Sequence, residues 1–289
     1  MGFLQRLFQR KPARPRPRPV SLPLTRREPA GRRMRAGWST DVGRQRQHNE
    51  DALLVVEANQ DGDSPLPPFG LFILADGMGG HRSGEVASAL ATRMVARHIL
   101  QQVYLAALYQ RDHDAEQLPL KEVLVEAVNL ANAAVATAVP GGGTTLICAL
   151  MLGAQAYIAN VGDSRAYLVS PEGLEQITRD HSLVDRLVEL GQLTEAQAVN
   201  HPQKNVLYRA VGQGGVLEVD TFIHAIPPGH SLLLCSDGLW GMVDREEMTR
   251  IITTARSPQA ACDALVAAAN QAGGKDNISA ILVEVPGEL

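Results

Sequence analysis

Five short acidic motifs, each next to an apolar run, constrain this chain more than any other feature of its sequence. They are, in chain order, Glu50-Asp51, Asp76-Gly-Met-Gly-Gly80, Val161-Gly-Asp-Ser-Arg165, Ser236-Asp-Gly-Leu-Trp240 and Lys275-Asp-Asn-Ile278. A single Asp-Gly pair is most often a turn, but strand ends are also where a fold places functional groups. Carboxylates that gather there repel one another unless cations neutralise them, and hard divalent cations prefer oxygen ligands. The motifs therefore predict a site for hard divalent ions.

The remaining metal-binding residue types argue against a soft-metal site. Cysteine and histidine residues do not recur at the spacing of a zinc site. The chain has three cysteines, an odd number set in apolar stretches, which predicts buried thiols in a reducing compartment rather than disulfides. We therefore expect a cytoplasmic protein. The longest strongly apolar run, residues 146–152, is far shorter than the ~20 residues that span a bilayer, so we expect no membrane-spanning helix.

Short apolar runs with turn-forming residues between them predict the sheets. The expected strands are residues 52–58, 69–75, 144–152, 155–160, 165–169, 174–178, 219–226, 231–236 and 278–285. Strands this closely spaced favour antiparallel meanders, and their grouping predicts a core of two sheets.

Apolar residues at helical spacing predict helix pairs outside this core. The first pair covers residues 83–110, with Ser83 as the expected N-cap, and residues 119–139. The second pair follows Asp244, which would form a capping box with Glu247, and Ser257-Pro258. Residues 181–215 break this rhythm with short helices near 183–190 and from Thr194, and we expect them to form a polar insertion outside the core.

The first 34 residues differ sharply in charge from the rest of the chain. Residues 1–35 contain 11 Lys and Arg and one acid, whereas the remainder contains 16 bases and 30 acids. The Pro and Arg alternation of residues 11–19 predicts a disordered arm with polyproline character over residues 1–34. Phe3, Leu4, Leu7 and Phe8 could share one helix face and dock on anionic lipid or an acidic partner, which would place the protein at a membrane surface. The alternative is a solvated tail with no specific partner, and we expect no nucleic-acid binding.

Taken in order, the motifs resemble those of a known enzyme family. The matching series is Thr40-Asp-Val-Gly-Arg-Gln-Arg-Gln-His-Asn-Glu-Asp51, Asp76-Gly-Met-Gly-Gly80, Gly143-Thr-Thr145, Val161-Gly-Asp-Ser-Arg165, Ser236-Asp-Gly-Leu-Trp240 and Asp276-Asn-Ile-Ser279. It closely resembles the metal-dependent protein phosphatases of the PPM, or protein phosphatase 2C, type, and their bacterial serine/threonine branch in particular. The resemblance runs from about Arg35 to Val285.

This resemblance implies an α+β fold, a four-layer α/β/β/α sandwich of two antiparallel sheets flanked by helix pairs. The phosphatase domain would cover residues 35–286, with a flap insertion at about 181–215 that borders the active site. Two Mn²⁺ or Mg²⁺ ions would lie at one end of the sandwich, and the water that they share would attack a phosphoserine or phosphothreonine directly. No covalent enzyme intermediate is then needed.

The resemblance also implies roles for individual residues. Asp76 would bridge the two metals, and the Gly77 carbonyl would ligate the second. Asp237 and Asp276 would complete the first metal's protein ligands. Asp51 would serve the second metal, chiefly through water.

Three further residues take roles from the same resemblance. Glu50 would act through a coordinated water, and Arg46 would receive the substrate phosphate. Asp163 with Asp237 would hold a third, weaker metal. From the residues alone, Arg46 could instead be a surface cation, and Asp163 with Arg165 a surface ion pair.

Two positions depart from the pattern of many relatives. Met78 stands where many eukaryotic members have a histidine that is a candidate general acid, so we expect a metal-bound water to protonate the leaving oxygen. His48 and His181 are weaker candidates for that role. Gly241 stands where many relatives have an aspartate that helps to hold the third metal, which puts this third site in doubt.

The function expected from this resemblance is a phosphatase that acts on phosphoproteins, opposes a bacterial Ser/Thr kinase and works as a monomer. One alternative is a regulator that acts on a phosphorylated anti-sigma antagonist, although shorter regulators of that kind tend to lack the flap. Another is an inactive phosphatase fold used as a binding module, which should have lost metal carboxylates. A third is an unrelated two-metal hydrolase acting on nucleotides, which should show a Gly-rich phosphate cradle that this sequence lacks.

Overall fold

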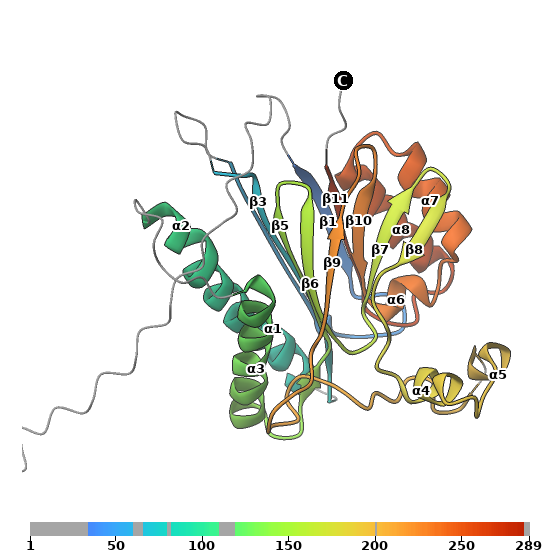
Figure 1. The fold of residues 1–289 in the computed structure, drawn as a ribbon. Coiled ribbons are helices and arrows are strands. Elements are labelled where there is room, and N and C mark those ends of the chain that lie inside the picture. The colour runs from blue at the N-terminus through green and yellow to red at the C-terminus, as the bar shows by residue number, and fades with distance from the viewer. Residues whose placement is uncertain (1–33, 60–65, 80–81, 110–118, 200, 286–289) are drawn as a thin grey trace, which may run out of the picture.

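Central strands that are apolar on both faces build four packed layers, seen edge-on in Figure 1. The computed structural model describes residues 34–59, 66–79, 82–109, 119–199 and 201–285, so nearly all of the predicted basic arm lies outside the described residues. Two antiparallel sheets form the inner layers, and helices cover their outer faces (Figure 1). The predicted α+β sandwich is therefore confirmed.

Each sheet is continuous and antiparallel. In the first, the strand order is β1 (Arg35–Asp41), β11 (Ile278–Glu284), β10 (Ser231–Cys235), β7 (Arg165–Ser170) and β8 (Gly173–Gln176). In the second, the order is β2 (Asp51–Ala58), β3 (Phe69–Met78), β5 (Leu146–Leu152), β6 (Gln155–Val161) and β9 (Asp220–Ala225), and β4 (Gly143–Thr144) pairs with the end of β3.

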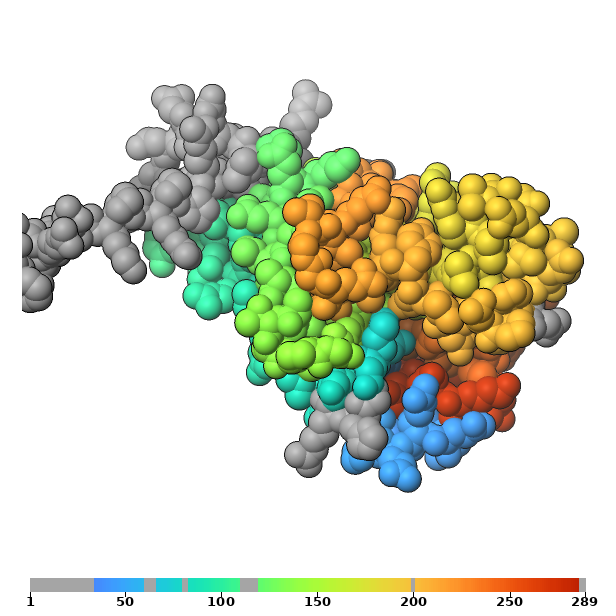
Figure 2. Space-filling view, turned by 90° about the horizontal axis from the view of Figure 1, so that it is seen from below, coloured from blue at the N-terminus to red at the C-terminus, as the bar shows by residue number. Residues whose placement is uncertain are grey.

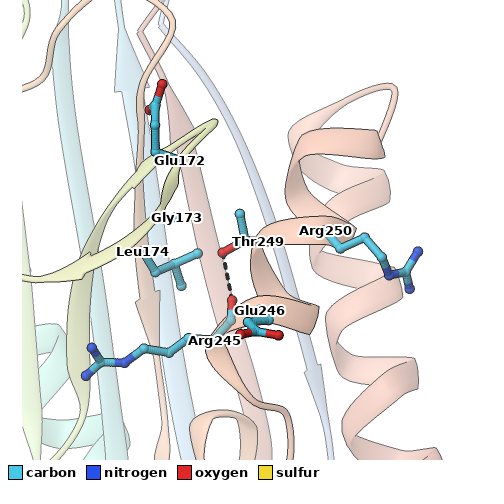
Figure 3. A pocket seen from close by; sticks show the side chains of 7 residues that line it. All are labelled: Glu172, Gly173, Leu174, Arg245, Glu246, Thr249 and Arg250. Atoms are coloured by element: carbon cyan, nitrogen blue, oxygen red, sulfur yellow. Dashed lines mark hydrogen bonds between the residues drawn. The ribbon is translucent and has the colours of Figure 1, made fainter.

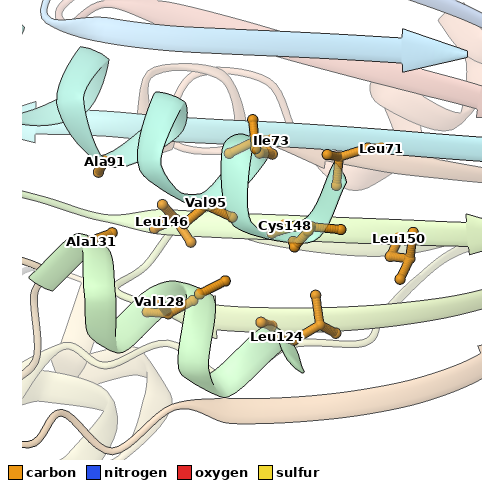
Figure 4. Packing of buried hydrophobic residues seen from close by; sticks show 14 of the residues in the cluster. Leu71, Ile73, Ala91, Val95, Leu124, Val128, Ala131, Leu146, Cys148 and Leu150 are labelled. Atoms are coloured by element: carbon orange, nitrogen blue, oxygen red, sulfur yellow. The ribbon is translucent and has the colours of Figure 1, made fainter. Parts of the chain in front are cut away.

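Successive residues of the central strands point to opposite sides, which divides the core into three layers of side chains. On β5, Leu146, Cys148 and Leu150 face the helices, whereas Ile147 and Ala149 lie between the two sheets. Figure 4 shows the first set packed against Val95 of one helix and Val128 of another. All three cysteines are buried and unbridged, as the sequence predicts.

Helices cover both outer faces. One face carries α1 (Arg82–Ile99), a π-helical turn η2 (Leu100–Tyr104), α2 (Leu105–Tyr109) and α3 (Leu120–Ala138); the other carries α6 (Asp237–Trp240), α7 (Arg245–Thr254) and α8 (Pro258–Gln271). In the described part of the chain, no helix combines the length and apolar character that a membrane crossing requires.

Local signals in the sequence identify several helix starts correctly. The Asp244 side chain accepts a hydrogen bond from the Glu247 amide, and Ser257 caps α8, with Pro258 in its first turn. The Glu247 carboxylate completes no capping box, because it pairs with Arg250 instead. Ser83 is not an N-cap, since α1 already begins at Arg82.

Two elements differ from the expectation in extent. Strand β1 has no predicted counterpart, because its sequence Arg-Ala-Gly-Trp-Ser-Thr-Asp has too few apolar residues to signal a strand by itself. The segment 181–215 carries α4 (Leu183–Glu189) and α5 (Glu195–Val199), which project beside the sandwich in Figure 1. Its two ends belong to the folded core, however, because His181 and Val211 are buried and Val211 packs with the α1–α3 side chains. The expectation that all of 181–215 lies outside the core is therefore too broad.

Gly37 is where α8 approaches the edge strand β1 most closely. A Cβ atom at this position would lie 2.2 Å from the Gln259 amide nitrogen and 2.3 Å from the Pro258 carbonyl carbon. Backbone atoms cannot swing aside, so α8 would have to move as a whole.

Gly37→Ala is expected to lower the free energy of unfolding by about 1–3 kcal/mol, as overpacking of a close contact does. Urea unfolding followed by circular dichroism measures this. Ser39→Ala, two residues along the same face of β1, is the matched control and should change stability by less than about 0.5 kcal/mol. Equal unfolding midpoints for the two variants would show that α8 does not rest on Gly37.

Candidate metal centre

The acidic motifs meet at one end of the sandwich, the lower end in Figure 1. Asp51 begins β2 directly opposite Asp76 near the end of β3, a position that brings two side chains to within about 5 Å at their Cβ atoms. Asp237 follows β10 and Asp276 precedes β11, and a hydrogen bond of 3.1 Å from the Ser236 amide to the Ser279 carbonyl joins these two segments. Four carboxylates from both sheets thus face one edge.

Electrostatics confirm that these carboxylates share one environment. The pKa of Asp76 is raised well above its usual value, first by burial and then by the negative charges of Asp51, Asp237, Asp163 and Asp276. Burial is also the main cause that raises the pKa of Asp51 to about 7 and of Asp237 to about 6, and their carboxylate neighbours add to it. Without a cation, a carboxyl group with a pKa of about 7, such as that of Asp51, would keep its proton in part near neutral pH.

The residues at this edge fit a pair of hard divalent ions. Among the described residues, the Oδ1 atoms of Asp51 and Asp237 are buried and have no hydrogen-bond partner. A buried carboxylate oxygen without a partner is costly, and an ion would satisfy it. A Cβ at Gly77 would lie 2.3 Å from the Gly84 carbonyl oxygen and 2.6 Å from that of Glu50, so only glycine fits beside Asp76. The donors are all oxygens, as Mn²⁺ and Mg²⁺ prefer.

The side chains are not yet arranged as a complete cage. Within the described part of the chain, no group of three or more His, Cys, Asp and Glu side chains is positioned to hold an ion. Two of the carboxylates are engaged by protein donors instead. Arg46 Nη2 lies 2.7 Å from Asp276 Oδ2, and Ser279 Oγ donates to Asp51 Oδ2 at 2.6 Å. The backbone therefore brings the acids together, while two side chains must turn from these donors toward an ion.

Arg46 and Glu50 belong to the loop that follows β1. Arg46 is half exposed, and its hydrogen bond to Asp276 is the main cause that raises the pKa of its guanidinium. Burial raises the pKa of Glu50, which Arg46 partly offsets. Arg46 therefore lies at the surface and contacts the carboxylate cluster through Asp276.

Asp163 lies beside this cluster and is held by its main chain. Its carbonyl oxygen accepts a hydrogen bond of 3.1 Å from Trp240 Nε1. The residue is 8% exposed, and burial, followed by the charge of Asp237, raises the pKa of its carboxyl group to about 8. Arg165 stacks on the Trp240 ring at 3.5 Å and forms a two-pronged ion pair with Asp180. The alternative of a surface ion pair between Asp163 and Arg165 is therefore wrong.

The two histidines considered as general acids occupy very different places. His181 is 1% exposed, its Nδ1 accepts from the Gly162 amide at 3.1 Å, and its Nε2 faces Asp220 at 3.4 Å. Burial lowers the pKa of His181, and both ring nitrogens are occupied. His181 therefore positions the Gly162 turn and is wrong as a general acid. His48 is exposed on the Arg46 loop.

Asn277 organises the site although the sequence assigns it no role. Its Oδ1 accepts from the Glu50 amide at 2.8 Å, and its Nδ2 donates to the Val42 and His48 carbonyls at 2.9 Å each. One buried amide thereby ties both ends of the loop that carries Arg46. One sequence signal could have identified Asn277: it lies in a polar motif directly before the apolar strand β11. An amide side chain at such a position must find its hydrogen-bond partners in neighbouring loops, because the apolar core has none.

Two threonines in the Gly143-Thr-Thr145 motif support Asp76 in the same way. Thr145 Oγ1 accepts from the Asp76 amide at 2.9 Å, and Thr144 Oγ1 donates to the Asp76 carbonyl at 2.9 Å. Both threonines are buried, so the amide and the carbonyl of Asp76, near the end of β3, are each held by a buried hydroxyl group.

A hollow elsewhere on the surface lacks these properties. It has a volume of about 430 Å³ and lies between the β7–β8 turn and α7. Arg245 and Arg250 at its rim point away from one another in Figure 3, and they bind Gln176 and Glu247 respectively. No set of polar groups converges there, so the candidate site remains the carboxylate edge.

Asn277→Ala is expected to loosen the loop of residues 42–50 because it removes three hydrogen bonds at once. Hydrogen–deuterium exchange should be about tenfold faster at the Glu50, Arg44 and Gln45 amides. A tenfold change corresponds to about 1.4 kcal/mol, which is less than the three lost hydrogen bonds could contribute together. Asn129→Ala removes comparable bonds between α3 and Leu217, so its effect should stay near residue 217. Unchanged exchange at residues 44–50 in Asn277→Ala would contradict this role.

The raised pKa values predict how pH affects the stability of the metal-free protein. Asp51 and Asp163 have pKa values of about 7 and 8, against about 4 in an unfolded chain. The folded state binds more protons between these values, so the stability that these two groups contribute is fully present below about pH 4 and is lost as pH rises through 7 to 8. The melting temperature in chelator should fall by at least about 5 °C between pH 5.5 and 8.5.

Added Mn²⁺ should remove most of this fall, and Asp163→Asn should reduce its slope in chelator. Differential scanning fluorimetry across the pH range makes the measurement. A melting temperature that rises with pH in chelator would contradict the assignment of buried, proton-retaining carboxylates.

Comparison with known proteins agrees with the fold and identifies the family. A family model described as Protein phosphatase 2C matches residues 43–272. The serine/threonine phosphatase stp of Listeria monocytogenes is 42% identical over 251 residues, which cover 87% of this chain and 96% of that protein.

Solved structures are similar over the same extent. The serine/threonine phosphatase of S. agalactiae matches with a TM-score of 0.74 and 31% identity, covering 87% of this chain and 99% of that one. The catalytic domain of the phosphatase PstP, whose structure holds 2 manganese ions, matches with a TM-score of 0.69 and 30% identity, covering 88% and 98%. With the family model, the sequence identity and the sandwich in agreement, the chain belongs to the protein phosphatase 2C family.

Proposed function

We propose that this chain hydrolyses phosphoserine and phosphothreonine in proteins, with two Mn²⁺ or Mg²⁺ ions held at the carboxylate edge. The observation that carries the proposal is that Asp51, Asp76, Asp237 and Asp276 come from four chain segments and meet at one end of the sandwich. Family membership and the manganese-bound relative support the same reaction.

Asp76 would bridge the two ions, with the Gly77 carbonyl and Asp51 serving the second and Asp237 and Asp276 the first. Glu50 would act through a water molecule. Support comes from the buried, partnerless Oδ1 atoms of Asp51 and Asp237 in the described residues and from the glycine beside Asp76. When bound, the two ions supply a water of lowered pKa for in-line attack on phosphorus and offset the phosphoryl charge.

Arg46 would bind the substrate phosphate through two oxygens. Its guanidinium already pairs with the Asp276 carboxylate, an oxyanion of similar geometry, and half of its side chain is exposed to an arriving substrate. Donating to two phosphate oxygens would orient the phosphorus and stabilise charge that grows in the transition state. With Met78 unable to donate a proton and His181 buried, a water molecule is the proton donor that we propose for the leaving oxygen.

A third, weaker ion at Asp163 and Asp237 is a finer part of the proposal. Asp163 is nearly buried, and Asp237 is the charge that raises its pKa most after burial itself. Gly241 supplies no carboxylate there, so occupancy should be weaker than at the other two positions.

The partners follow from the same reaction. Phosphoproteins are the proposed substrates, including those of a bacterial Ser/Thr kinase, and the enzyme is proposed to act as a monomer bordered by the flap near residues 181–215. The basic arm, residues 1–34, is proposed to hold the domain near anionic lipid or an acidic partner, because it gathers ten of the 27 bases in an otherwise acidic chain. An inactive binding module is disfavoured, since all four metal carboxylates are present.

Asp76→Asn and Arg46→Ala should fail in different ways. Asp76→Asn should abolish both Mn²⁺ uptake in calorimetry and Mn²⁺-dependent hydrolysis of p-nitrophenyl phosphate, because it removes the shared ligand. Arg46→Ala should keep Mn²⁺ uptake but lower kcat/KM for a phosphopeptide by about 10- to 100-fold, the value of a charge-assisted pair of hydrogen bonds.

Chelator is the control for wild type and should stop hydrolysis reversibly. A wild-type protein that binds phosphopeptide and Mn²⁺ without releasing phosphate would favour the binding module. Full activity of Asp76→Asn would rule out the dimetal assignment itself.

A further inference from the structure

Two exposed cations, Arg44 and Lys275, flank the Arg46–Asp276 pair at the mouth of the site. Arg44 lies two residues before Arg46, and Lys275 directly precedes Asp276. Figure 2, which looks onto this end of the molecule, shows the blue loop after β1 beside the red segment that leads into β11. Both residues therefore lie on the two loops that carry Arg46, the proposed phosphate ligand, and its partner Asp276.

The main chain holds these two cations in a fixed register. The Arg44 and Gln45 amides both donate to the Gly274 carbonyl, at 2.7 and 3.2 Å. A Cβ on Gly274 would lie 2.8 Å from the Arg44 nitrogen and 2.9 Å from its Cγ, and Gly274 has a φ of +48°. The two loops thus touch at Gly274, with the Arg44 side chain lying against this turn.

Both cations are available to a ligand. Neither Arg44 nor Lys275 takes part in an ion pair or side-chain hydrogen bond among the described residues. Several arginines of the domain, among them Arg165, Arg209 and Arg250, instead pair with carboxylates. They are basic residues in an otherwise acidic part of the chain, because residues 36–289 hold 30 acids against 16 bases.

We propose that Arg44 and Lys275 form a subsite for a second negative charge that lies close to the phosphorylated residue of the substrate. This inference rests on the proposed phosphatase function and specifies its substrate class. The second charge is an oxyanion, either the carboxylate of a neighbouring Asp or Glu or a second phosphate. An extended peptide advances about 3.3 Å per residue, so a group within three positions of the phosphoresidue reaches this rim.

The size of the effect follows from the exposure of both side chains. An exposed ion pair contributes about 0.2–1 kcal/mol, so two together favour an acidic substrate by about 2- to 30-fold over a neutral one. Salt screens such pairs, because the Debye length falls to about 3 Å at 1 M ionic strength. The preference should therefore be strong in dilute buffer and weak in concentrated salt.

The test measures kcat/KM of the Mn²⁺-loaded full chain on four phosphoserine peptides of one sequence. They differ at a single position two residues from the phosphoserine, which carries Ala, Asp, a second phosphoserine or Lys. Wild type should prefer the Asp and doubly phosphorylated peptides to the Ala peptide by about fivefold or more in dilute buffer, and the Lys peptide should be the poorest. The Asp and phosphoserine arms distinguish a carboxylate from a phosphate as the favoured group.

The variant Arg44→Glu/Lys275→Glu should abolish or reverse this order of peptides, and Arg44→Gln/Lys275→Gln should make their kcat/KM values nearly equal. Arg256→Glu is the matched control. Arg256 is an exposed cation just before α8, whereas Gly274 follows the other end of this 14-residue helix, so the two positions are about 20 Å apart. It should keep the wild-type order.

Equal kcat/KM values of wild type on all four peptides would overturn the subsite, as would an order that survives in both double variants. Failure of wild type to release phosphate from any of the peptides would instead overturn the proposed function. The salt dependence of the wild-type order provides a check that needs no variant, and an order unchanged at 0.5 M salt would contradict a charge-based subsite.

Discussion

Repulsion among carboxylates brought together at one edge of the sandwich is the constraint on which the site depends. Asp51, Asp76 and Asp237 come from different segments of the chain and are buried, so their negative charges raise one another's pKa. Such a cluster is stable only with protons or cations on it. Divalent ions satisfy this need and at the same time provide the chemistry of phosphate ester hydrolysis.

The rest of the structure holds these charges in place against that repulsion. Buried hydroxyl groups of Thr144 and Thr145 grip the peptide groups of Asp76, and the Asn277 amide ties the Arg46 loop to the start of β2. These contacts go to the main chain, which fixes where each carboxylate begins but leaves its side chain free to turn. Arg46 and Ser279 bind two of those carboxylates in this conformation. Metal binding would replace these donors with a cation, and phosphate binding would replace the Asp276 carboxylate on Arg46 with another oxyanion.

The same edge separates general chemistry from substrate choice. The carboxylates lie at the sheet ends and are fixed by buried strands, whereas Arg44 and Lys275 lie on loops that meet only through Gly274. Loops tolerate change in exposed side chains without disturbing the core. The proposed subsite could therefore change its preference among phosphoproteins while the proposed metal ligands stay the same.

Much of this could be predicted from the sequence, because its signals are local. Short apolar runs between turn-forming residues predict nearly all of the strands. The acidic motifs with their glycines predict that Asp76, Asp237 and Asp276 belong to one site, and the fold brings them to the same edge. Strand β1 was not predicted because it is an edge strand with few apolar residues. The predicted capping box is incomplete because the Glu247 carboxylate binds Arg250 instead.

Contacts between residues far apart in the chain were decided only by the tertiary structure. The roles of Asn277, of His181 as a buried anchor for Gly162, and of Arg165 as the partner of Asp180 depend on which loops the fold brings together. The sequence by itself determined the chemistry of the site, since residue type sets which ions and protons a side chain accepts. Only the packing of the two sheets decided which of these side chains share one edge, because that depends on burial and hydrogen bonding across hundreds of residues.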